Sequence, residues 1–360
     1  MKTYKNLWDS YISDENIRLA CKNAAKGSKH GSLLRIAEDP DIEKLRQVAI
    51  RFRPVMHKPK FINDGIKQKK REIIVPNCYE QIVHHMQINI LKPIFMHGMY
   101  EHSYASIPGR GAHRAKRTIE QWIRDGKDIK YCMKLDIHKF FPSIPNGLLK
   151  ERLARIIKDE RFLNALYTTI DTCEGLPIGF YTSQWLSNWY LQPLDHYIKE
   201  NLHASHYVRY MDDMVIFGSN KKKLRKMLDA IRNYLKTIGL ELKGNYQIFR
   251  FHYIRNGEHG RPVDYMGFKF YRNRTTLRKS ILKRARRSAI TISKKEKPTL
   301  YDCRKILSYM GWIDATDTYG YYMRHIKPIV NIQYVKRRVS RAGRREYAKS
   351  RVQERNGLSA

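Results

Sequence analysis

The stretch "HYVRYMDDMVIFG", residues 206–218, decides the fold of this chain. Two acidic residues, Asp212 and Asp213, stand side by side between two apolar segments rich in strand-favouring residues. The pattern predicts a hairpin with the acidic pair at its turn. A plain turn is one explanation, since Asp is common in turns. Neither residue is the Gly that a two-residue hairpin turn prefers, so the turn is either strained for a purpose or wider than two residues.

A third acidic residue, Asp136, lies near the end of "DIKYCMKLDI" (128–137), in which apolar residues alternate with others. The alternation predicts a half-buried strand with Asp136 at its exit. If this strand and the hairpin share a sheet, the three carboxylates converge, and their repulsion requires a cation. Mg²⁺ fits, because it takes oxygen ligands and bridges to phosphates. Two such ions, for which Mn²⁺ can substitute, would activate a 3′ hydroxyl and stabilise leaving pyrophosphate.

The composition indicates a polyanionic partner. The 360 residues include 70 Lys and Arg against 34 Asp and Glu, a formal net charge of +36. Such a charge favours binding to nucleic acid. The chain is 42% apolar and can bury a core, which excludes a disordered basic tail. It shows no apolar run of eighteen residues and no secretory leader, so no membrane is expected. Five scattered cysteines fit reduced thiols, and we expect a cytoplasmic protein.

The order of predicted elements favours an α+β fold. Helical periodicity appears at 79–97, 146–157, 183–200 and 221–239, and an N-terminal helix has Ser13 or Asp14 as its N-cap. Residues 240–251 and 264–278 favour strands, and the basic segment from about 278 onward favours helices.

Several motifs, taken together, resemble those of reverse transcriptases. "YMDD" (210–213), "MKLDIHKFFPSI" (133–144), "LPIGFYTSQWLSNWYLQPLD" (176–195), "GLELKGNYQIF" (239–249) and "VDYMGFKF" (263–270) resemble successive palm blocks of that family. Residues 69–95 and 102–115 resemble the fingers blocks of group-II-intron-like bacterial enzymes, and 308–326 resemble their thumb. The resemblance covers about 15–335 and implies a right-hand polymerase fold. It places fingers at 1–128, palm at 129–275 with part of the fingers at 145–182, and a helical thumb with a basic tail at 276–360.

The resemblance is closest to one branch of the family. Where most reverse transcriptases carry Gln-Gly-x-x-x-Ser-Pro, this chain has "IGFYTSQ", Ile178 to Gln184, the form of diversity-generating retroelement enzymes. Such enzymes, bacterial or phage-encoded, copy a template RNA with errors at adenines, and the cDNA rewrites a target gene. Gln can hydrogen-bond near the incoming nucleotide and Ile cannot, a loss of about 1 kcal/mol of discrimination. The alternatives are a packing substitution in an accurate retron-like or phage-defence enzyme, and a non-catalytic RNA-binding scaffold.

The resemblance implies metal ligands and a proton donor. Asp136, Asp212 and Asp213 match the metal-binding aspartates, and the carbonyl of Ile137 can add an oxygen. Lys243 matches a lysine that protonates departing pyrophosphate, although a sheet-edge lysine without this role explains it equally well.

The nucleotide-binding residues are also implied by the resemblance. Arg71 matches the fingers arginine over the triphosphate, whereas Lys69 belongs to a lysine run that solvation alone can explain. Phe141 matches the ring that excludes a 2′ hydroxyl, and one of the pair Phe140 and Phe141 should face away from the core. The motif itself contributes Ile178, Gly179 and Gln184.

Template and primer contacts are expected from a loop and a hairpin. The loop residues are Ser103, Tyr104, Gly109, Arg110 and Gly111, for which an ordinary surface loop is the alternative. The primer-grip residues are Tyr265, Met266, Gly267 and Phe268. The partners implied are template RNA, the RNA/DNA hybrid held by the basic C-terminal helices, dNTPs, and a small basic helical accessory protein that forms oligomers.

Overall fold

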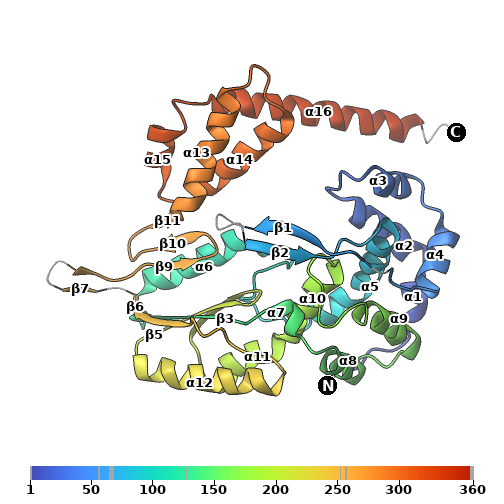
Figure 1. Cartoon of the computed structure of the whole chain (residues 1–360), viewed down its shortest axis with the longest axis horizontal. Coiled ribbons are helices and arrows are strands. Elements are labelled where there is room, and N and C mark those ends of the chain that lie inside the picture. Colours follow the sequence, from blue (N-terminus) through green and yellow to red (C-terminus); the bar gives the residue numbers. More distant parts are fainter. Residues whose placement is uncertain are drawn as a thin grey trace. The chain divides into compact units, whose positions relative to one another are not determined.

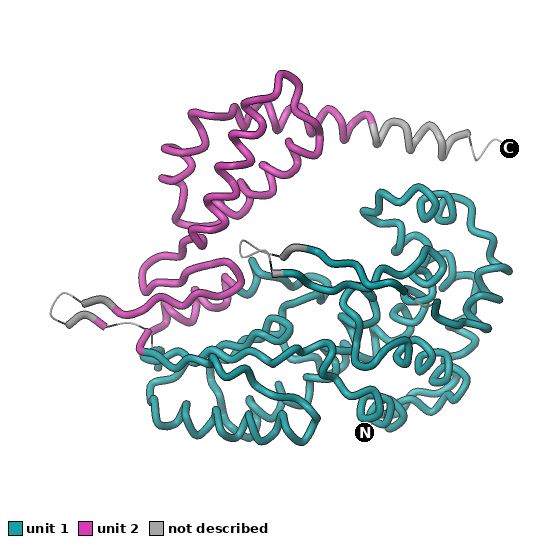
Figure 2. The backbone as a smooth tube through the Cα atoms, viewed as in Figure 1, with its two compact units in different colours: residues 1–115, 128–249 teal, residues 116–127, 250–360 magenta. Residues whose placement is uncertain are grey.

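The computed structural model describes residues 2–55, 57–64, 69–126, 128–251, 253–255 and 258–356. The chain forms two compact units (Figure 2). Unit 1 contains residues 1–115 and 128–249, and unit 2 contains residues 116–127 and 250–360. This division follows compactness, whereas the three predicted domains follow roles in polymerisation, so the domain boundaries stay a prediction.

A four-stranded sheet forms the centre of unit 1. Its strands, in spatial order, are β4 (His206–Tyr210), β5 (Asp213–Gly218), β3 (Tyr131–Asp136) and β6 (Gln247–Arg250). β5 pairs antiparallel with both β3 and β4. The predicted strand and hairpin therefore share one sheet, and the middle residues of β5 are buried.

Helices cover this sheet and build the rest of unit 1 (Figure 1). Helix α12 (Lys221–Thr237) packs against β5 with its apolar stripe and is N-capped by Asn220. The other helices are α1 (Trp8–Tyr11), α2 (Asp14–Ala25), α3 (Gly31–Glu38), α4 (Ile42–Ile50), α5 (Cys78–Met96), α7 (Phe140–Ser143), α8 (Asn146–Ile156), α9 (Glu160–Ile170), α10 (Tyr181–Tyr190), α11 (Gln192–His196) and the π-helix η1 (Tyr197–Asn201).

A two-stranded ribbon precedes α5. Its strands are β1 (Lys60–Asp64) and β2 (Lys69–Ile73), which pair antiparallel. Asn77 and Glu80 form a capping box at the start of α5, satisfying two backbone N–H groups that a helix end leaves unpaired. The apolar residues of α5 then pack against α2 and α10. Because β2 leads directly into α5, this packing fixes the C-terminal end of β2 within unit 1.

Unit 2 combines a small sheet with helices. The sheet contains β9 (Val263–Tyr265), β10 (Phe268–Phe270) and β11 (Thr275–Leu277), and a separate ribbon contains β7 (Ile254–Arg255) and β8 (Glu258–His259). The helices are α13 (Lys279–Ser293), α14 (Leu300–Asp314), α15 (Tyr319–His325) and α16 (Ile332–Asn356). Helix α6 (Ala112–Asp125) has its first four residues in unit 1 and the others in unit 2. Within the described ranges, no helix has the length and apolar character to cross a bilayer.

The α+β class is confirmed, and three local predictions need correction. The segment 183–200 is not one helix, because Pro193 lacks the N–H of a continuing helix and the chain breaks into α10, α11 and η1. Strand structure after residue 240 begins only at Gln247. The turn of the acidic hairpin consists of Met211 and Asp212, whereas Asp213 is already the first residue of β5.

Candidate active site

Pairing of the strands brings two distant acidic segments together. Asp136 at the end of β3 lies opposite Asp213, and Tyr210 pairs with Asp213 across the hairpin. The turn between them has only two residues, and Met211 takes a left-handed φ of 58°. A non-glycine residue pays about 1–2 kcal/mol for this conformation. The sequence predicted a strained turn at Asp212 and Asp213, and the backbone strain is found one residue earlier, at Met211.

The carboxylates of Asp136 and Asp212 are close enough to perturb each other. Asp212 is half-buried, and its pKa is raised, first by burial and then by the negative charge of Asp136. Hydrogen bonding between the two carboxyl groups acts in the same direction, whereas the positive charge of Lys243 opposes it. Burial is the larger cause of the raised pKa of Asp212, and the nearby carboxylate of Asp136 adds to it.

Lys243 is the cation in contact with this pair. Its Nζ donates to Asp136 Oδ1 at 2.5 Å, and its backbone N–H donates to the Asp136 carbonyl at 2.8 Å. Leu242 forms an isolated antiparallel bridge with Ile137, completed by the His138 N–H bonding to Glu241. Lys243 thus lies beside the carboxylates, and its role as a proton donor stays a prediction.

The donor set suits a divalent cation in part. Asp136 and Asp212 supply carboxylates that face each other. The two hydrogen bonds of the bridge between Ile137 and Leu242 use the Asp136 carbonyl and the His138 N–H, so the Ile137 carbonyl takes no part in the bridge. Mg²⁺ takes such oxygen ligands readily. However, no group of three or more His, Cys, Asp or Glu side chains among the described residues could hold a metal ion. Asp136 and Asp212 interact with each other, and the register of β3 and β5 places Asp213 directly opposite Asp136 on the same face of the sheet. The three aspartates as a metal site stay a prediction.

The motif at 178–184 docks against the β1–β2 ribbon. The Ile178 carbonyl accepts a hydrogen bond of 2.8 Å from the Ile74 N–H, next to the end of β2. Gly179 has φ +118°, and a Cβ there would lie 2.1 Å from the Ile74 carbonyl oxygen, so only glycine fits. Ile178 is half-buried, and Gln184 is exposed on the first turn of α10. The motif and the ribbon are one connected substructure.

The remaining nucleotide-binding candidates lie on two elements of unit 1. Arg71 is exposed on β2 and pairs across the ribbon with Ile62. Lys69 begins β2, and its side chain lies outside the described part of the structure. Phe140 is buried and Phe141 half-exposed, as expected for a pair with one ring free, although the segment is the short helix α7 and not an extended strand.

The loop predicted to contact the template is stabilised by hydrogen bonds between its own residues. Ser103 and Tyr104 are buried, and their contact with a template stays a prediction. Arg110 is partly buried and donates to the carbonyls of Tyr100 and Ser103. Burial also lowers the pKa of Arg110. These three residues shape the loop: Ser103 and Tyr104 are packed inside it, and Arg110 supplies the hydrogen-bond donors that two of its carbonyls need.

The two glycines of the loop are more open. Gly109 and Gly111 have φ of +72° and +143°. Among the described residues, and apart from the chain neighbours of each glycine, no heavy atom lies within 4 Å of the point that a Cβ would occupy. They are the members of this set that leave backbone approachable by a ligand.

The predicted primer grip is a tight turn in unit 2. Met266 and Gly267 have φ of 51° and 91° and connect β9 to β10, whose Tyr265 and Phe268 pair directly. The rings of Tyr265 and Phe268 are buried, and Phe268 stacks on Trp312 of α14 with ring centroids 4.9 Å apart. Only Met266 is half-exposed among the four residues, so the two aromatic residues act as anchors of the turn.

One feature near the acidic hairpin was missed from the sequence. Arg209, in the middle of β4, is fully buried and forms a bidentate ion pair with the equally buried Asp195 of α11. The available signal was Arg209 beside the apolar residues Tyr207 and Val208, since a charged residue in a buried strand is almost never fully buried unless it is paired.

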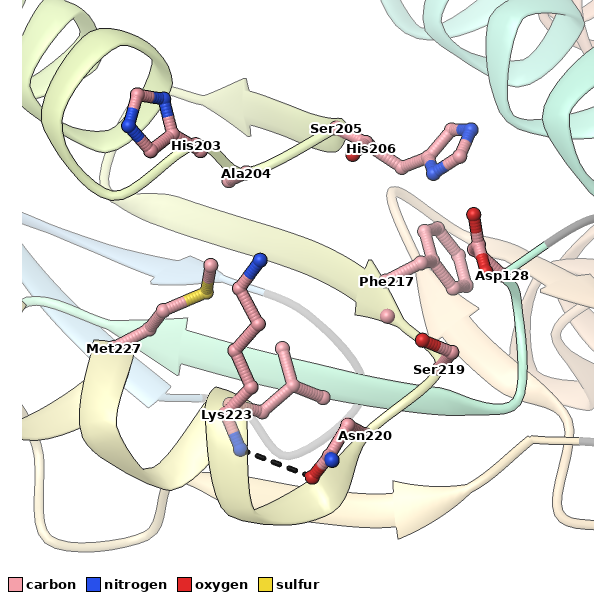
Figure 3. Close-up of a pocket in the computed structure, with 12 residues that line it drawn as sticks. Asp128, His203, Ala204, Ser205, His206, Phe217, Ser219, Asn220, Lys223 and Met227 are labelled. Carbon is pink, nitrogen blue, oxygen red and sulfur yellow. Dashed lines mark hydrogen bonds between the residues drawn. The ribbon is translucent and has the colours of Figure 1, made fainter.

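A small cavity lies at the other end of the hairpin (Figure 3). Its volume is about 140 Å³, and it is lined by residues at the start of β4, including His206, and at the end of β5, including Phe217. The Lys223 N–H donates to the Asn220 side chain at 3.2 Å at its lower edge. The length of β5 separates this cavity from Asp213, so it does not belong to the carboxylate site.

The sheet with acidic residues at neighbouring strand ends fits the α+β polymerase fold predicted from the sequence. The family described as reverse transcriptase (RNA-dependent DNA polymerase) matches residues 56–270, more than half of the chain. The chain belongs to this family.

Individual relatives are more distant. Protein YkfC of Escherichia coli (strain K12) is 28% identical over 145 residues, covering 37% of this chain and 38% of that protein. Retron Ec73 reverse transcriptase of Escherichia coli is 30% identical over 135 residues, covering 34% of this chain and 43% of that protein. The matches thus span about two fifths of each relative.

Among solved structures, telomerase from Candida tropicalis in complex with the TWJ fragment of telomeric RNA is similar in fold. The TM-score is 0.51 at 12% identity, and the match covers 82% of this chain and 55% of that chain. At this identity the likeness concerns the fold alone, and it agrees with the predicted α+β polymerase fold.

Proposed function

We propose that the chain is an RNA-directed DNA polymerase that makes cDNA from a template RNA by phosphoryl transfer. The observation that carries the proposal is the proximity of the Asp136 and Asp212 carboxyl groups, where the central strand β3 ends beside the turn that leads into β5, in a chain of this family. Crowded carboxylates at one point of a strongly basic protein suit cation-assisted chemistry on nucleic acid.

Each side chain of the site has a defined task under this proposal. Mg²⁺, held by Asp136 and Asp212, would lower the pKa of the primer 3′ hydroxyl and stabilise the pyrophosphate. Lys243, already placed at the carboxylates, donates a proton to the departing pyrophosphate. Arg71 presents a planar fork to the triphosphate. Phe141 offers a half-exposed ring that collides with a 2′ hydroxyl and so favours dNTPs.

Primer extension tests the polymerase directly. The purified chain is given poly(rA)/oligo(dT), dTTP and Mg²⁺, and incorporation of dTMP is measured. We expect extension of the primer with dTTP and at least tenfold less with UTP, because a single steric clash is worth about 1–3 kcal/mol. Absence of extension on RNA templates with either Mg²⁺ or Mn²⁺ would refute the proposal and favour the RNA-binding scaffold.

We further propose that copying is error-prone at template adenines and serves targeted sequence diversification. The support is Ile178, whose half-buried side chain cannot make the hydrogen bond available to Gln and whose carbonyl is fixed by Ile74. Restoring a contact of about 1 kcal/mol by Ile178→Gln should lower misincorporation roughly fivefold. Ile178→Leu, which keeps an apolar side chain of equal size, is the control and should leave errors unchanged.

The similarity to a retron reverse transcriptase favours one alternative, an enzyme of normal fidelity. The error spectrum of cDNA copied from a defined template separates the two functions. Misincorporation concentrated opposite adenines supports the diversifying enzyme, whereas rare and evenly distributed errors support the retron-like enzyme.

The partners proposed are template RNA, its hybrid with cDNA, dNTPs and a small basic helical accessory protein that forms oligomers. A cytoplasmic location in a bacterium or its phage goes with this proposal. Failure of a small basic protein encoded beside this gene to co-purify with the chain would count against the accessory partner.

A further inference from the structure

A buried ion pair lies directly behind the acidic hairpin. Arg209 Nε donates to Asp195 Oδ1 at 2.7 Å, and Arg209 Nη2 donates to Asp195 Oδ2 at 2.6 Å. Both side chains have an exposed fraction of 0%. The Tyr207 hydroxyl donates to the same Asp195 Oδ1 at 2.7 Å. The pair is therefore fully hydrogen-bonded, as a buried charge requires.

The third nitrogen of the guanidinium reaches the turn itself. Arg209 Nη1 donates to the Met211 carbonyl at 3.1 Å and to Asn188 Oδ1 at 3.0 Å. Met211 is the strained turn residue, and its sulfur accepts a hydrogen bond of 3.5 Å from Ser187. Arg209 and Ser187 of α10 thus fix the conformation of Met211, the turn residue next to Asp212, through hydrogen bonds.

The backbone of Arg209 holds a second element. Its N–H donates to the His102 carbonyl, and its carbonyl accepts from the Tyr104 N–H, both at 3.0 Å. Asn188 Nδ2 donates to the Ala105 carbonyl at 2.9 Å. The loop around residues 102–105 is therefore attached to the strand that ends in the turn, through the same arginine.

We propose that Arg209, oriented by Asp195, is a positioning residue that sets the hairpin turn so that Asp212 faces Asp136. The proposal rests on the proposed function, because Asp212 is placed there in the polymerase site. Arg209 does not touch substrate. It acts through the Met211 carbonyl, and its rigid fork is what allows one side chain to serve Asp195, Asn188 and the turn together.

A purely stabilising role makes a different prediction. Replacing a buried ion pair by apolar residues of similar size is often neutral or stabilising, whereas removing one partner alone is strongly destabilising. If the pair served stability only, an apolar double replacement would leave a folded and fully active protein. If it positions the turn, the same protein would fold and yet lose activity.

Two variants test the proposal in the full-length chain. Arg209→Lys keeps the charge and loses the fork, and the double variant Arg209→Met with Asp195→Leu removes both charges. Arg232→Lys, in an exposed pair with Asp229 on α12, is the matched control. Misplacement of a reacting group by about 1 Å can lower a rate roughly 100-fold. We expect kcat for primer extension to fall roughly 10- to 100-fold in both test variants, with the KM for dTTP within about twofold of wild type.

A second readout does not depend on activity. Mn²⁺ binding, followed by electron paramagnetic resonance, should weaken several-fold in both test variants and stay unchanged in Arg232→Lys. Wild-type kcat and wild-type Mn²⁺ affinity in either folded test variant would overturn the positioning role. If the wild-type chain does not extend primers, the proposed function fails, and Mn²⁺ binding still decides whether Arg209 organises the carboxylates.

Discussion

Substitution of Gly179 by Ala should disconnect the motif at 178–184 from the β1–β2 ribbon. The structure leaves no room for the change, because the new Cβ would lie 2.1 Å from the Ile74 carbonyl oxygen. An ordinary contact between carbon and oxygen is about 3.3 Å or longer, so this carbonyl would have to retreat by roughly 1 Å. The same peptide region provides the 2.8 Å hydrogen bond from Ile74 to Ile178, which the retreat would break.

Two costs add up for Gly179→Ala. A side chain at φ +118° is strained by about 1–3 kcal/mol. Loss of the hydrogen bond contributes about 0.5–1.5 kcal/mol. The free energy of unfolding of unit 1 should fall by roughly 2–4 kcal/mol, and the midpoint of thermal unfolding by roughly 5–15 °C. Because the motif borders the ribbon that carries Arg71, the KM for dNTPs should also rise.

Two other glycines provide controls for this substitution. Gly109 has φ +72° with open space around it, so Gly109→Ala carries the backbone strain without the collision. Gly147 lies in the first turn of α8 with open space and no positive φ, so Gly147→Ala should be neutral or stabilising by up to about 1 kcal/mol. Thermal unfolding and dTTP kinetics are measured on all three. A Gly179→Ala protein that melts with wild type and keeps its KM would show that the collision with Ile74 is not decisive.

Three further perturbations have defined outcomes. Because burial and Asp136 raise the pKa of Asp212, the folded state binds this proton more tightly than the unfolded chain. Asp212→Asn should therefore be more stable than wild type at pH 7, and urea titrations in EDTA should show the difference closing below about pH 4. Lys243→Met removes a half-exposed ion pair and should change stability by about 1 kcal/mol or less. Its kcat should fall roughly 100-fold in single-turnover extension, with the KM for dTTP unchanged. Ser13→Ala removes the N-cap of α2 and should cost about 1 kcal/mol in chemical unfolding, without effect on extension.

The sequence was informative where a single local pattern determines structure. Alternation in 128–137 predicted β3, and the apolar stretches on either side of Asp212 and Asp213 predicted β4 and β5. Consecutive residues are buried in all three strands, so β3 is covered on both faces and is not half-buried as predicted. Of the two N-cap candidates, Ser13 and Asp14, the structure has Ser13, whose side chain accepts a hydrogen bond from the Asn16 N–H. Asp136 and Asp212 were brought together by the same reasoning.

Features that depend on distant contacts could not be predicted in the same way. The turn moved to Met211 and Asp212 because Arg209 and Ser187 hold Met211 from other elements. Tyr104 resembled a surface loop residue, and its burial depends on how the loop packs against β4. Partners of this kind are far apart in the chain, and no local periodicity reports them.

The proposed role of the two facing carboxylates is measured most simply as the single-turnover rate of dTMP incorporation on poly(rA)/oligo(dT) by wild type, Asp136→Asn and Asp212→Asn. Thermal unfolding of the same samples shows that each variant is folded. We predict that both variants lose at least about 1,000-fold in rate, because each removes a charge that the transferring phosphoryl group requires. Incorporation by either folded variant at the wild-type rate would contradict a catalytic role for the pair.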